Sequence, residues 1–390
     1  MAYNKIFFHL GPGGNAQGLG QMIDTLDARG IPVCVKSADH AGPVYELAQH
    51  TGVQHVPVFR LSSAGQNDGY NYDIPPYHLS PADAAREHWA RHRAKMPPEL
   101  FGRDVWVEAM NEPNKDMSDW LGHFAAEIAP LILDDGFRFS AFGFSGGEPE
   151  PEHWRTTGMR RYLLLAQNDP RLSVSLHEYS CIQPGAPLHL MYGYPSLVGR
   201  FWGLFAACDE ANIGRPRVII TEFGWGAWSA PLHDQVISGP GLPSMTGMQQ
   251  VEWAASEYAK SDHVLGVATW YLGGGYSGIA DKVQPYIAPV TSMTANTVFP
   301  PGPGPGPAPS PKQAIWDDTV REQVAHGIRL NPAAAIQREI FSDGFVPVIN
   351  EIQSNGYTAQ AAENLSSGER RVYIWSPSHG VSWFGDPQSS

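Results

Sequence analysis

Residues 104 to 147 read DVWVEAMNEPNKDMSDWLGHFAAEIAPLILDDGFRFSAFGFSGG and contain two β-rich runs with a longer run between them. The first β-rich run ends at Pro113, and the second begins at Arg138. The run between them, from Ser118 to Gly136, has the composition and length of a helix. A strand, a helix and a second strand in this order predict one unit of a parallel sheet with a crossover helix.

The same alternation continues on both sides of this unit. One helix candidate runs from Leu19 to Gly30, and another begins at Pro81 with Ser80 as its predicted N-cap. Eight such units in about 270 residues match the size and order of an α/β (β/α)8 TIM barrel, and we predict that fold class. The eight predicted strands are Lys5 to Gly11, Pro32 to Asp39, His55 to Ser62, Asp104 to Pro113, Arg138 to Gly146, Leu172 to Ser180, Arg217 to Trp225 and Val264 to Gly273.

A Pro/Gly-rich segment, PPGPGPGPAPSPK, follows the eighth strand between Pro300 and Lys312. Because this composition supports neither helices nor sheet ladders, we expect an extended spacer. The sequence thus predicts three parts, which are a barrel domain over residues 1–295, a linker over 296–313 and a small α+β accessory module over 314–390.

The accessory module contains predicted helices and a hairpin. Helix candidates run from Asn331 to Gly344 and from Thr358 to Gly368. The hairpin is formed by RRVYIW, which ends at Trp375, and VSWFG, which begins at Val381.

Composition and charge restrict the partners and the compartment. The formal charge of −13 argues against nucleic acid and against an anionic membrane surface as partners. Cys34, Cys181 and Cys208 are odd in number and widely spaced, so we expect buried thiols and neither a disulfide framework nor a zinc knuckle. We find no leader pattern and no apolar run of about 18 residues, which leaves a cytoplasmic, a phage-delivered and a secreted protein with its leader removed as open alternatives.

Two predicted strands end in glutamates. In a TIM barrel the reacting groups lie at the carboxyl ends of the strands, and here strand four ends in Asn111-Glu112-Pro113-Asn114 and strand seven in Thr221-Glu222. Strands four and seven face each other across the mouth, which favours the separation of about 5–5.5 Å that retaining glycosidic cleavage requires. We expect a raised pKa for one carboxyl group, Glu112, and an ionised Glu222.

Neighbouring residues complete this hypothesis. Asn111 is expected to bind the sugar 2-hydroxyl. At the end of strand six, Tyr179 is expected to donate to Glu222 and keep it ionised, whereas His177 orients substrate or Glu112. Glu108 is interpreted as a structural partner of Arg60 or Lys36, and Glu178 as a contact to a helix.

These motifs resemble clan A of the glycoside hydrolases. The resemblance rests on Asn-Glu-Pro at strand four, His-x-Tyr at strand six, Glu-Phe-Gly at strand seven and Trp270 on strand eight, over about residues 1 to 290. Families five and thirty-nine are most similar. The resemblance implies that Glu112 is the acid/base, that Glu222 is the nucleophile, and that Asn111, His177, Tyr179 and Trp270 support them.

The residues at the end of strand two differ from the pattern of family five. Members of that family carry an arginine near the end of strand two, where this chain reads Lys36-Ser37-Ala38-Asp39-His40. Arg60 on strand three is the expected substitute.

A row of aromatic side chains is predicted to stack on sugar rings, and this favours endo action on a β-linked polysaccharide or oligosaccharide. Its members are Tyr179, Trp225, Trp228, Trp270, Tyr271 and Tyr276.

Several alternatives stay open beside this hypothesis. The modular layout also suits a phage-type or cell-wall lytic glycosidase acting on murein, with the accessory module contacting the wall or a glycan. A non-catalytic carbohydrate-binding barrel and a serine esterase using Ser145 belong to other classes, although the acidic, proline-containing run after Ser145 disfavours a nucleophile elbow. His88 and His92 have zinc-ligand spacing but are interpreted as a solvated helix face. The proposed hydrolysis requires no metal and no cofactor.

Overall fold

A computed structural model describes the chain in two compact units, residues 1–302 and 303–390. In the first unit the described residues are 3–180, 186–226, 229–239, 241–276 and 278–299. In the second they are 346–347, 352–354, 357–363, 370–376 and 380–385.

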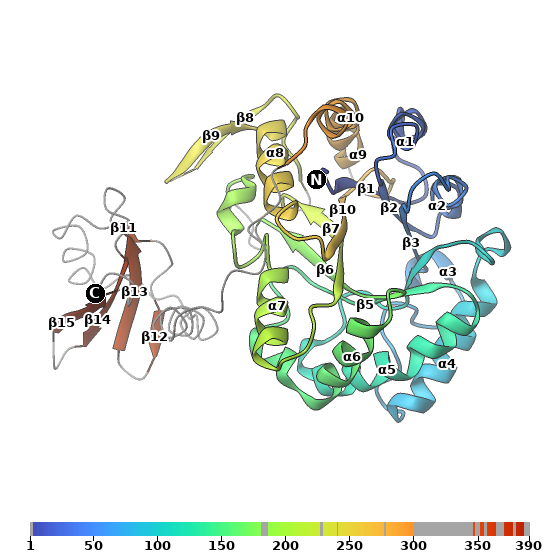
Figure 1. Cartoon of the computed structure of the whole chain (residues 1–390), viewed down its shortest axis with the longest axis horizontal. Coiled ribbons are helices and arrows are strands. Elements are labelled where there is room, and N and C mark those ends of the chain that lie inside the picture. The colour runs from blue at the N-terminus through green and yellow to red at the C-terminus, as the bar shows by residue number, and fades with distance from the viewer. Residues whose placement is uncertain are drawn as a thin grey trace. The chain divides into compact units, whose positions relative to one another are not determined.

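Eight parallel strands close into a barrel in the first unit (Figure 1). Consecutive barrel strands pair along the chain, and the last one, β10, closes the ring by pairing with β1 through the register Ile6↔Val267. The predicted (β/α)8 fold is confirmed, and each predicted strand contains one observed strand. The barrel strands are β1 (Ile6–Leu10), β2 (Cys34–Ala38), β3 (Val56–Arg60), β4 (Trp106–Glu108), β5 (Arg138–Phe144), β6 (Leu172–Tyr179), β7 (Arg217–Gly224) and β10 (Val264–Thr269).

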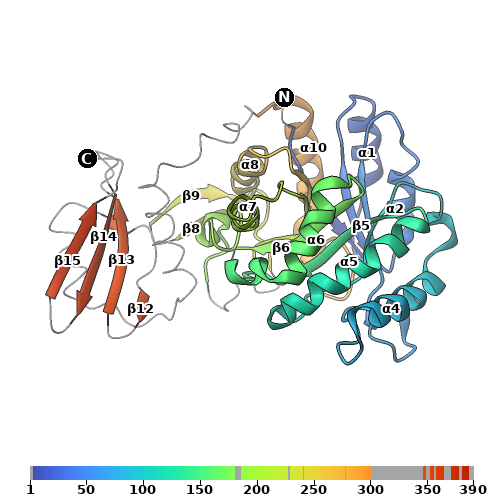
Figure 2. The same cartoon turned by 60° about the horizontal axis from the view of Figure 1, so that its bottom comes forward.

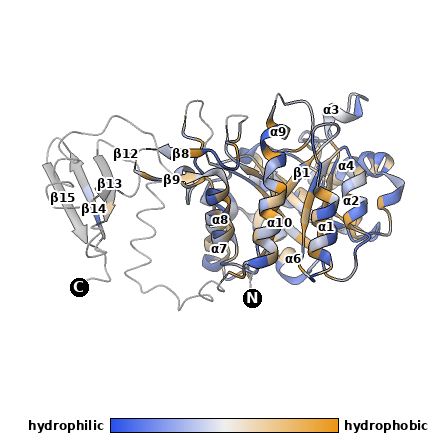
Figure 3. Cartoon of the chain, turned by 90° about the horizontal axis from the view of Figure 1, so that it is seen from above, coloured by the Kyte–Doolittle hydropathy of each residue, from blue (hydrophilic) through white to orange (hydrophobic). Residues whose placement is uncertain are grey.

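Helices surround this barrel (Figure 2). The predicted start of α4 is confirmed, because the Ser80 side chain accepts a hydrogen bond from the backbone N–H of Asp83 and Pro81 occupies the first turn. In Figure 3 the barrel strands carry hydrophobic colour and α4 is largely hydrophilic. The helices are α1 (Leu19–Asp27), α2 (Ala41–Leu47), α3 (Ser63–Gln66), α4 (Pro81–Lys95), α5 (Ser118–Asp134), α6 (Thr157–Asn168), α7 (Phe201–Glu210), α8 (Gly247–Tyr258), α9 (Ile279–Val283) and α10 (Ile287–Asn296).

Two further features of the first unit bear on the sequence predictions. A two-stranded hairpin, β8 (Val236–Gly239) and β9 (Leu242–Thr246), is inserted between β7 and α8 and was not predicted. Cys34 and Cys208 are free and buried, as predicted, whereas Cys181 lies outside the described residues. None of the helices in the described parts of the chain combines the length and apolar character that crossing a bilayer demands.

The second unit contains a five-stranded antiparallel sheet in the described residues. The predicted hairpin is confirmed, since β14 and β15 pair through Arg371↔Gly385 and Ser376↔Gly380. The sheet order is β11-β13-β14-β15, with β12 also pairing with β13. The strands are β11 (Val346–Pro347), β12 (Ile352–Ser354), β13 (Tyr357–Glu363), β14 (Arg370–Ser376) and β15 (Gly380–Gly385).

The predicted helix from Thr358 to Gly368 is wrong, because residues 357–363 form β13. This strand has β14 on one side and β11 and β12 on the other, so its backbone groups are paired across the sheet. Such pairing overrides the helix propensity of its alanines. The other predicted helix, 331–344, and the Pro/Gly-rich segment from Pro300 to Lys312 lie outside the described residues.

Helices α5 and α6 follow the strands β4 and β5, and they meet where two glycines allow a close approach. A Cβ atom added at Gly122 would lie 2.1 Å from the backbone carbon of Gly158. A Cβ atom at Gly158 would lie 1.9 Å from the carbonyl oxygen of Asp119. Backbone atoms cannot rotate away as a side chain can, so a methyl group at either site would force the helices apart.

We therefore expect Gly122→Ala to lower the free energy of unfolding by about 1–3 kcal/mol, since overpacking outweighs the gain in helix propensity. Gly203→Ala is the matched control, because a Cβ atom at Gly203 of α7 would meet nothing within 4 Å. This control is expected to be neutral or to raise stability by up to about 1 kcal/mol. Urea unfolding of both variants measures the difference, and equal effects would contradict the close packing of α5 on α6.

Candidate active site

Two glutamates meet at the carboxyl ends of the barrel strands. Glu222 lies in β7, and Glu112 follows β4 by a few residues. One carboxylate oxygen of each glutamate and one ring nitrogen of His177 all lie within 4.8 Å of one another. The predicted juxtaposition across the mouth is therefore present in the structure, with the two carboxyl groups close to the spacing typical of retaining glycosidases.

The backbone after β4 gives the two glutamates different exposure. Glu112 has a left-handed φ of 47°, and its N–H donates to the carbonyl oxygen of Gly143 over 2.9 Å. The preceding N–H, of Asn111, donates to the carbonyl oxygen of Asp73 over 2.8 Å. As a result the Glu112 side chain lies at the rim and is 44% exposed, whereas the Glu222 side chain is 10% exposed.

Hydrogen-bond donors and cations surround the Glu222 carboxylate. The Tyr179 hydroxyl donates to its Oε2 over 2.7 Å, and Lys36 Nζ donates to its Oε1 over 3.3 Å. His177 Nδ1 lies 3.6 Å from Oε2, and His9 Nδ1 lies 3.9 Å from Oε1. Burial raises the pKa of Glu222, but His177, Lys36 and the other nearby basic groups outweigh it and hold this pKa well below the usual value. The expectation that Glu222 is ionised agrees with this surrounding.

Glu112 differs from the expectation. His177 Nδ1 lies 3.1 Å from Glu112 Oε1, and this hydrogen bond, together with the charge of His177 and a hydrogen bond from Ser145, lowers the pKa of Glu112 more than burial and the Glu222 charge raise it. The predicted raised pKa is therefore wrong for the protein without a bound sugar. The sequence placed His177 near the site, but only the structure shows that its ring nitrogen lies close enough to Glu112 to lower the pKa of that carboxyl group.

The alternation of β6 explains the roles of His177, Glu178 and Tyr179. His177 and Tyr179 face the barrel mouth, with His177 opposite Glu222 in the strand register. Glu178 faces the helices instead and accepts hydrogen bonds from the N–H groups of Gly199 and Phe201 and from the Tyr258 hydroxyl. The predicted helix contact of Glu178 is confirmed, and burial raises the pKa of this carboxyl group to about 7.

Below the two glutamates lies a buried group of charges. Lys36 Nζ is 2.6 Å from Glu108 Oε2, which confirms Glu108 as a structural partner of Lys36. Arg60 lies at the edge of this group, where it donates to Asp73 and its Nε is 4.0 Å from Glu108 Oε2. Arg60 was the expected substitute for the missing arginine of strand two, but in the structure it is Lys36, on strand two itself, that directly contacts Glu222.

The predicted aromatic row is only partly at the mouth. Trp270 stacks on Tyr271 with ring centroids 5.2 Å apart and meets Tyr276 edge to face at 4.6 Å. Tyr276 is 44% exposed, so these rings reach the surface. Trp225 is buried and donates to Gln250, which places its ring in the packing beneath the mouth, away from a surface where sugar would stack. Trp228 lies outside the described residues.

His9 and Asp73 were missed by the sequence analysis, and Lys36 was not assigned its contact with Glu222. A signal was present for two of them, because a histidine within IFFHL and a lysine within CVKSA interrupt runs that are otherwise mostly apolar. A polar residue in such a strand end indicates a polar site. Asp73 lies in a long loop, where no periodicity could have indicated it.

The spacing of Glu112, His177 and Glu222 would also fit a cation. However, the Lys36 ammonium group already lies 3.3 Å from Glu222 and would repel a second positive charge there.

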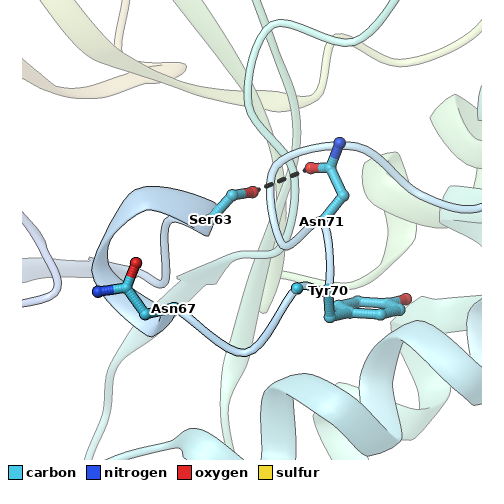
Figure 4. Close-up of a pocket in the computed structure, with 5 residues that line it drawn as sticks. Ser63, Asn67, Tyr70 and Asn71 are labelled. Atoms are coloured by element: carbon cyan, nitrogen blue, oxygen red, sulfur yellow. Dashed lines mark hydrogen bonds between the residues drawn. The ribbon is translucent and has the colours of Figure 1, made fainter.

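A polar pocket in the loop after β3 is separate from the glutamates (Figure 4). It is lined by Ser63, Asn67, Gly69, Tyr70 and Asn71. The Ser63 hydroxyl donates to Asn71 Oδ1 over 3.0 Å, and the same two side chains accept backbone N–H groups of their own loop. These polar groups therefore stabilise the loop, and the lining contains no acid or base for catalysis.

No known family model matches the chain, and no curated protein sequence matches it. Among solved structures, a modular endo-β-1,4-mannanase of glycoside hydrolase family 26 from Cellulomonas fimi is similar with a TM-score of 0.36 and 12% identity, over 98% of this chain and 93% of that one. A protein from Neocallimastix frontalis is similar with a TM-score of 0.35 and 12% identity, over 94% and 76% of the two chains. Similarity at this level carries no information on substrate or activity.

The interpretation of His88 and His92 as a solvated helix face is wrong, because both residues are fully buried. His88 lies between the Tyr70 hydroxyl, at 2.9 Å, and the carbonyl oxygen of Ala109, at 2.7 Å. His92 Nδ1 lies 2.9 Å from the carbonyl oxygen of His88. The sequence contains charged residues around this pair of histidines. In the structure, however, the face of α4 that carries the two histidines packs against α5 and the loop that precedes α4.

This burial predicts an acid-sensitive fold. Burial lowers the pKa of His92 to about 4, so the unfolded chain binds a proton near pH 6.5 that the folded chain excludes. The free energy of unfolding should fall by up to about 1.4 kcal/mol per pH unit for this residue as the pH drops from 6.5 toward 4. Urea unfolding of the wild type and of His92→Gln between pH 7 and 5 measures this. A slope that is equally steep in the variant would contradict the assignment.

Proposed function

We propose that this protein is a retaining glycoside hydrolase of clan A that acts on a β-linked polysaccharide or oligosaccharide. The observation that carries the proposal is the pair of carboxyl groups at the barrel mouth. One oxygen of each lies within 4.8 Å of an oxygen of the other, and one carboxyl group is buried among cations and donors whereas the other lies at the rim. Such asymmetry is what double displacement needs, because one carboxylate must attack while the other transfers a proton.

In the first step Glu222 attacks the anomeric carbon, and the bond between that carbon and the glycosidic oxygen breaks. Glu112 gives its proton to the departing oxygen. Tyr179 and Lys36 hold the Glu222 carboxylate in one orientation through contacts of 2.7 and 3.3 Å. In the second step Glu112, now ionised, takes a proton from water, and the resulting hydroxide releases the sugar from Glu222.

To act as an acid, Glu112 must carry a proton, but in the protein without a bound sugar its lowered pKa favours the ionised form. Glu112 is 44% exposed, so a sugar that covers it removes water and raises its pKa. The ionised Glu222 raises it further. Once the ester has formed this negative charge is gone, the pKa of Glu112 falls, and the residue becomes a base. Substrate binding and ester formation thus move the proton affinity of Glu112 in the directions that the two steps need.

Other groups at the mouth supply binding. Asn111 is adjacent to Glu112 and suits the 2-hydroxyl of the sugar that is attacked, while the partly exposed rings of Trp270 and Tyr276 suit stacking on a sugar face. Arg60, held by Asp73, is available to a sugar at the edge of the site. This arrangement favours oligosaccharides over small esters as substrates.

The serine-esterase alternative is weaker, because the turn after Ser145 leads to a 3-10 helix at Pro151–Arg155 and not directly to an α-helix.

Replacement of the two glutamates tests the proposal. Glu222→Ala is expected to abolish turnover of 4-nitrophenyl β-glycosides. Glu112→Ala is expected to lower the cleavage of glycosides with poorer leaving groups about 10²–10⁴-fold. With added azide, Glu222→Ala should yield the α-glycosyl azide and Glu112→Ala the β-glycosyl azide, because azide replaces the nucleophile in one case and water in the other. Proton NMR distinguishes the two products.

Glu150→Gln is the matched control. Glu150 forms an ion pair with Lys115, a partly exposed pair that contacts neither Glu112 nor Glu222, and the variant should keep wild-type activity. Full activity of Glu222→Ala, or loss of activity only in Ser145→Ala, would reject the proposed mechanism. A wild type that binds oligosaccharides but cleaves none would indicate a non-catalytic barrel, and cleavage confined to murein would indicate a lytic enzyme.

A further inference from the structure

The ammonium group of Lys36 is shared between two carboxylates. Lys36 is fully buried on β2, as is Glu108 on β4. Its Nζ atom lies 2.6 Å from Glu108 Oε2 and 3.3 Å from Glu222 Oε1. Glu108, which has no role in bond breaking, therefore holds the cation more closely than the nucleophile does.

Glu108 is itself fixed from several sides. Its Oε1 accepts a hydrogen bond from the Thr221 hydroxyl over 2.7 Å, and Thr221 directly precedes Glu222. A Cβ atom at Gly143 would lie 2.8 Å from Glu108 Oε1, so the glycine on β5 leaves room for this carboxylate. The position of Glu108 is thus set by β4, β5 and β7 together, and it fixes where the Lys36 ammonium group lies.

We propose that Lys36 and Glu108 act as a pair of positioning residues that tune Glu222, with Lys36 favouring its ionised form and Glu108 limiting how tightly Lys36 holds it. This inference rests on the proposed function of Glu222 as nucleophile. A carboxylate in a tight ion pair loses that interaction when it becomes an ester, and this raises the barrier to attack. A carboxylate with no cation nearby takes up a proton and cannot attack. The shared ammonium group lies between these extremes.

The charge balance of the reaction agrees with this arrangement. Before attack, Lys36, Glu108 and Glu222 carry a net charge of about −1, and after the ester has formed Lys36 and Glu108 neutralise each other. The Lys36 ammonium group therefore keeps a carboxylate partner in both states. Among the described residues, the other titratable or charged groups near Glu222 are His9 on β1, Arg60 on β3, Glu112 after β4, His177 and Tyr179 on β6, and Tyr271 after β10. All of them stay unchanged in the variants below.

The pair predicts pH shifts of opposite sign. In Lys36→Met, Glu222 faces Glu108 without a cation between them, so the acidic limb of the kcat/KM profile should move up by roughly 1–3 pH units. In Glu108→Gln, Lys36 is left to Glu222 alone, so the acidic limb should move down and kcat should fall. Lys36→Arg keeps the charge and should lie close to the wild type. The substrate is whichever 4-nitrophenyl β-glycoside the wild type cleaves best.

A matched control comes from the ion pair of Lys115 and Glu150, for which Lys115→Met and Glu150→Gln should not move the limb. If Glu108→Gln does not fold, Glu108→Asp draws the carboxylate back from Lys36 and should move the limb in the same direction by less. Shifts of the same sign in Lys36→Met and Glu108→Gln, or no shift in either folded variant, would overturn the inference.

Titration of the carboxyl group of Glu222 by carbon-13 NMR separates this inference from the proposed function. The resonance is assigned by its absence in Glu222→Gln, and no turnover is needed. Opposite shifts of the Glu222 pKa in Lys36→Met and Glu108→Gln would support the tuning even if no glycoside were cleaved, in which case the proposed function alone would fail. Equal pKa values in the three proteins would overturn the tuning even if the wild type were an active glycosidase.

Discussion

A carboxylate as deeply buried as Glu222 is stable only where cations and hydrogen-bond donors compensate for the lost water. In this protein the compensation comes from three strands other than its own, through His9 on β1, Lys36 on β2 and both His177 and Tyr179 on β6. Only a closed barrel brings the ends of all these strands to one point. The closure of β10 on β1 is therefore a condition for the charge state of Glu222 as well as for the hydrophobic core.

The two glutamates differ because the chain leaves β4 and β7 in different ways. Glu222 is still within its strand, and its side chain points into the barrel. Glu112 lies beyond the last paired residue of β4, in a left-handed conformation tied to Gly143 and reached through a backbone bond to Asp73. One carboxyl group is thus fixed in a dry site and the other remains at the rim, where a bound sugar can change its surroundings. The proposed division of labour between a nucleophile and a proton donor rests on this difference in backbone path.

Buried polar groups other than the two glutamates at the barrel mouth have structural roles that the same strands impose. Glu178 lies between His177 and Tyr179 but faces the opposite side of β6, where it receives the N–H groups at the start of α7. The strand alternation therefore lets one segment support the site on one face and anchor a helix on the other. His88 and His92 stabilise α4 against the loop after β3 in a comparable way, at the expense of stability in acid.

The sequence by itself determined the strand and helix order, because hydrophobic periodicity and capping residues such as Ser80 are local properties. It also determined which glutamates lie at strand ends, since strand ends are marked by the change to polar and turn-forming residues. Tertiary structure alone decided that Lys36 and not Arg60 touches Glu222, that Trp225 is buried, that His177 lowers the pKa of Glu112, and that residues 357–363 form a strand. These outcomes depend on distances between segments that are far apart in the chain. The closure of the barrel and the pairing within the second sheet set these distances, and no local sequence pattern contains them.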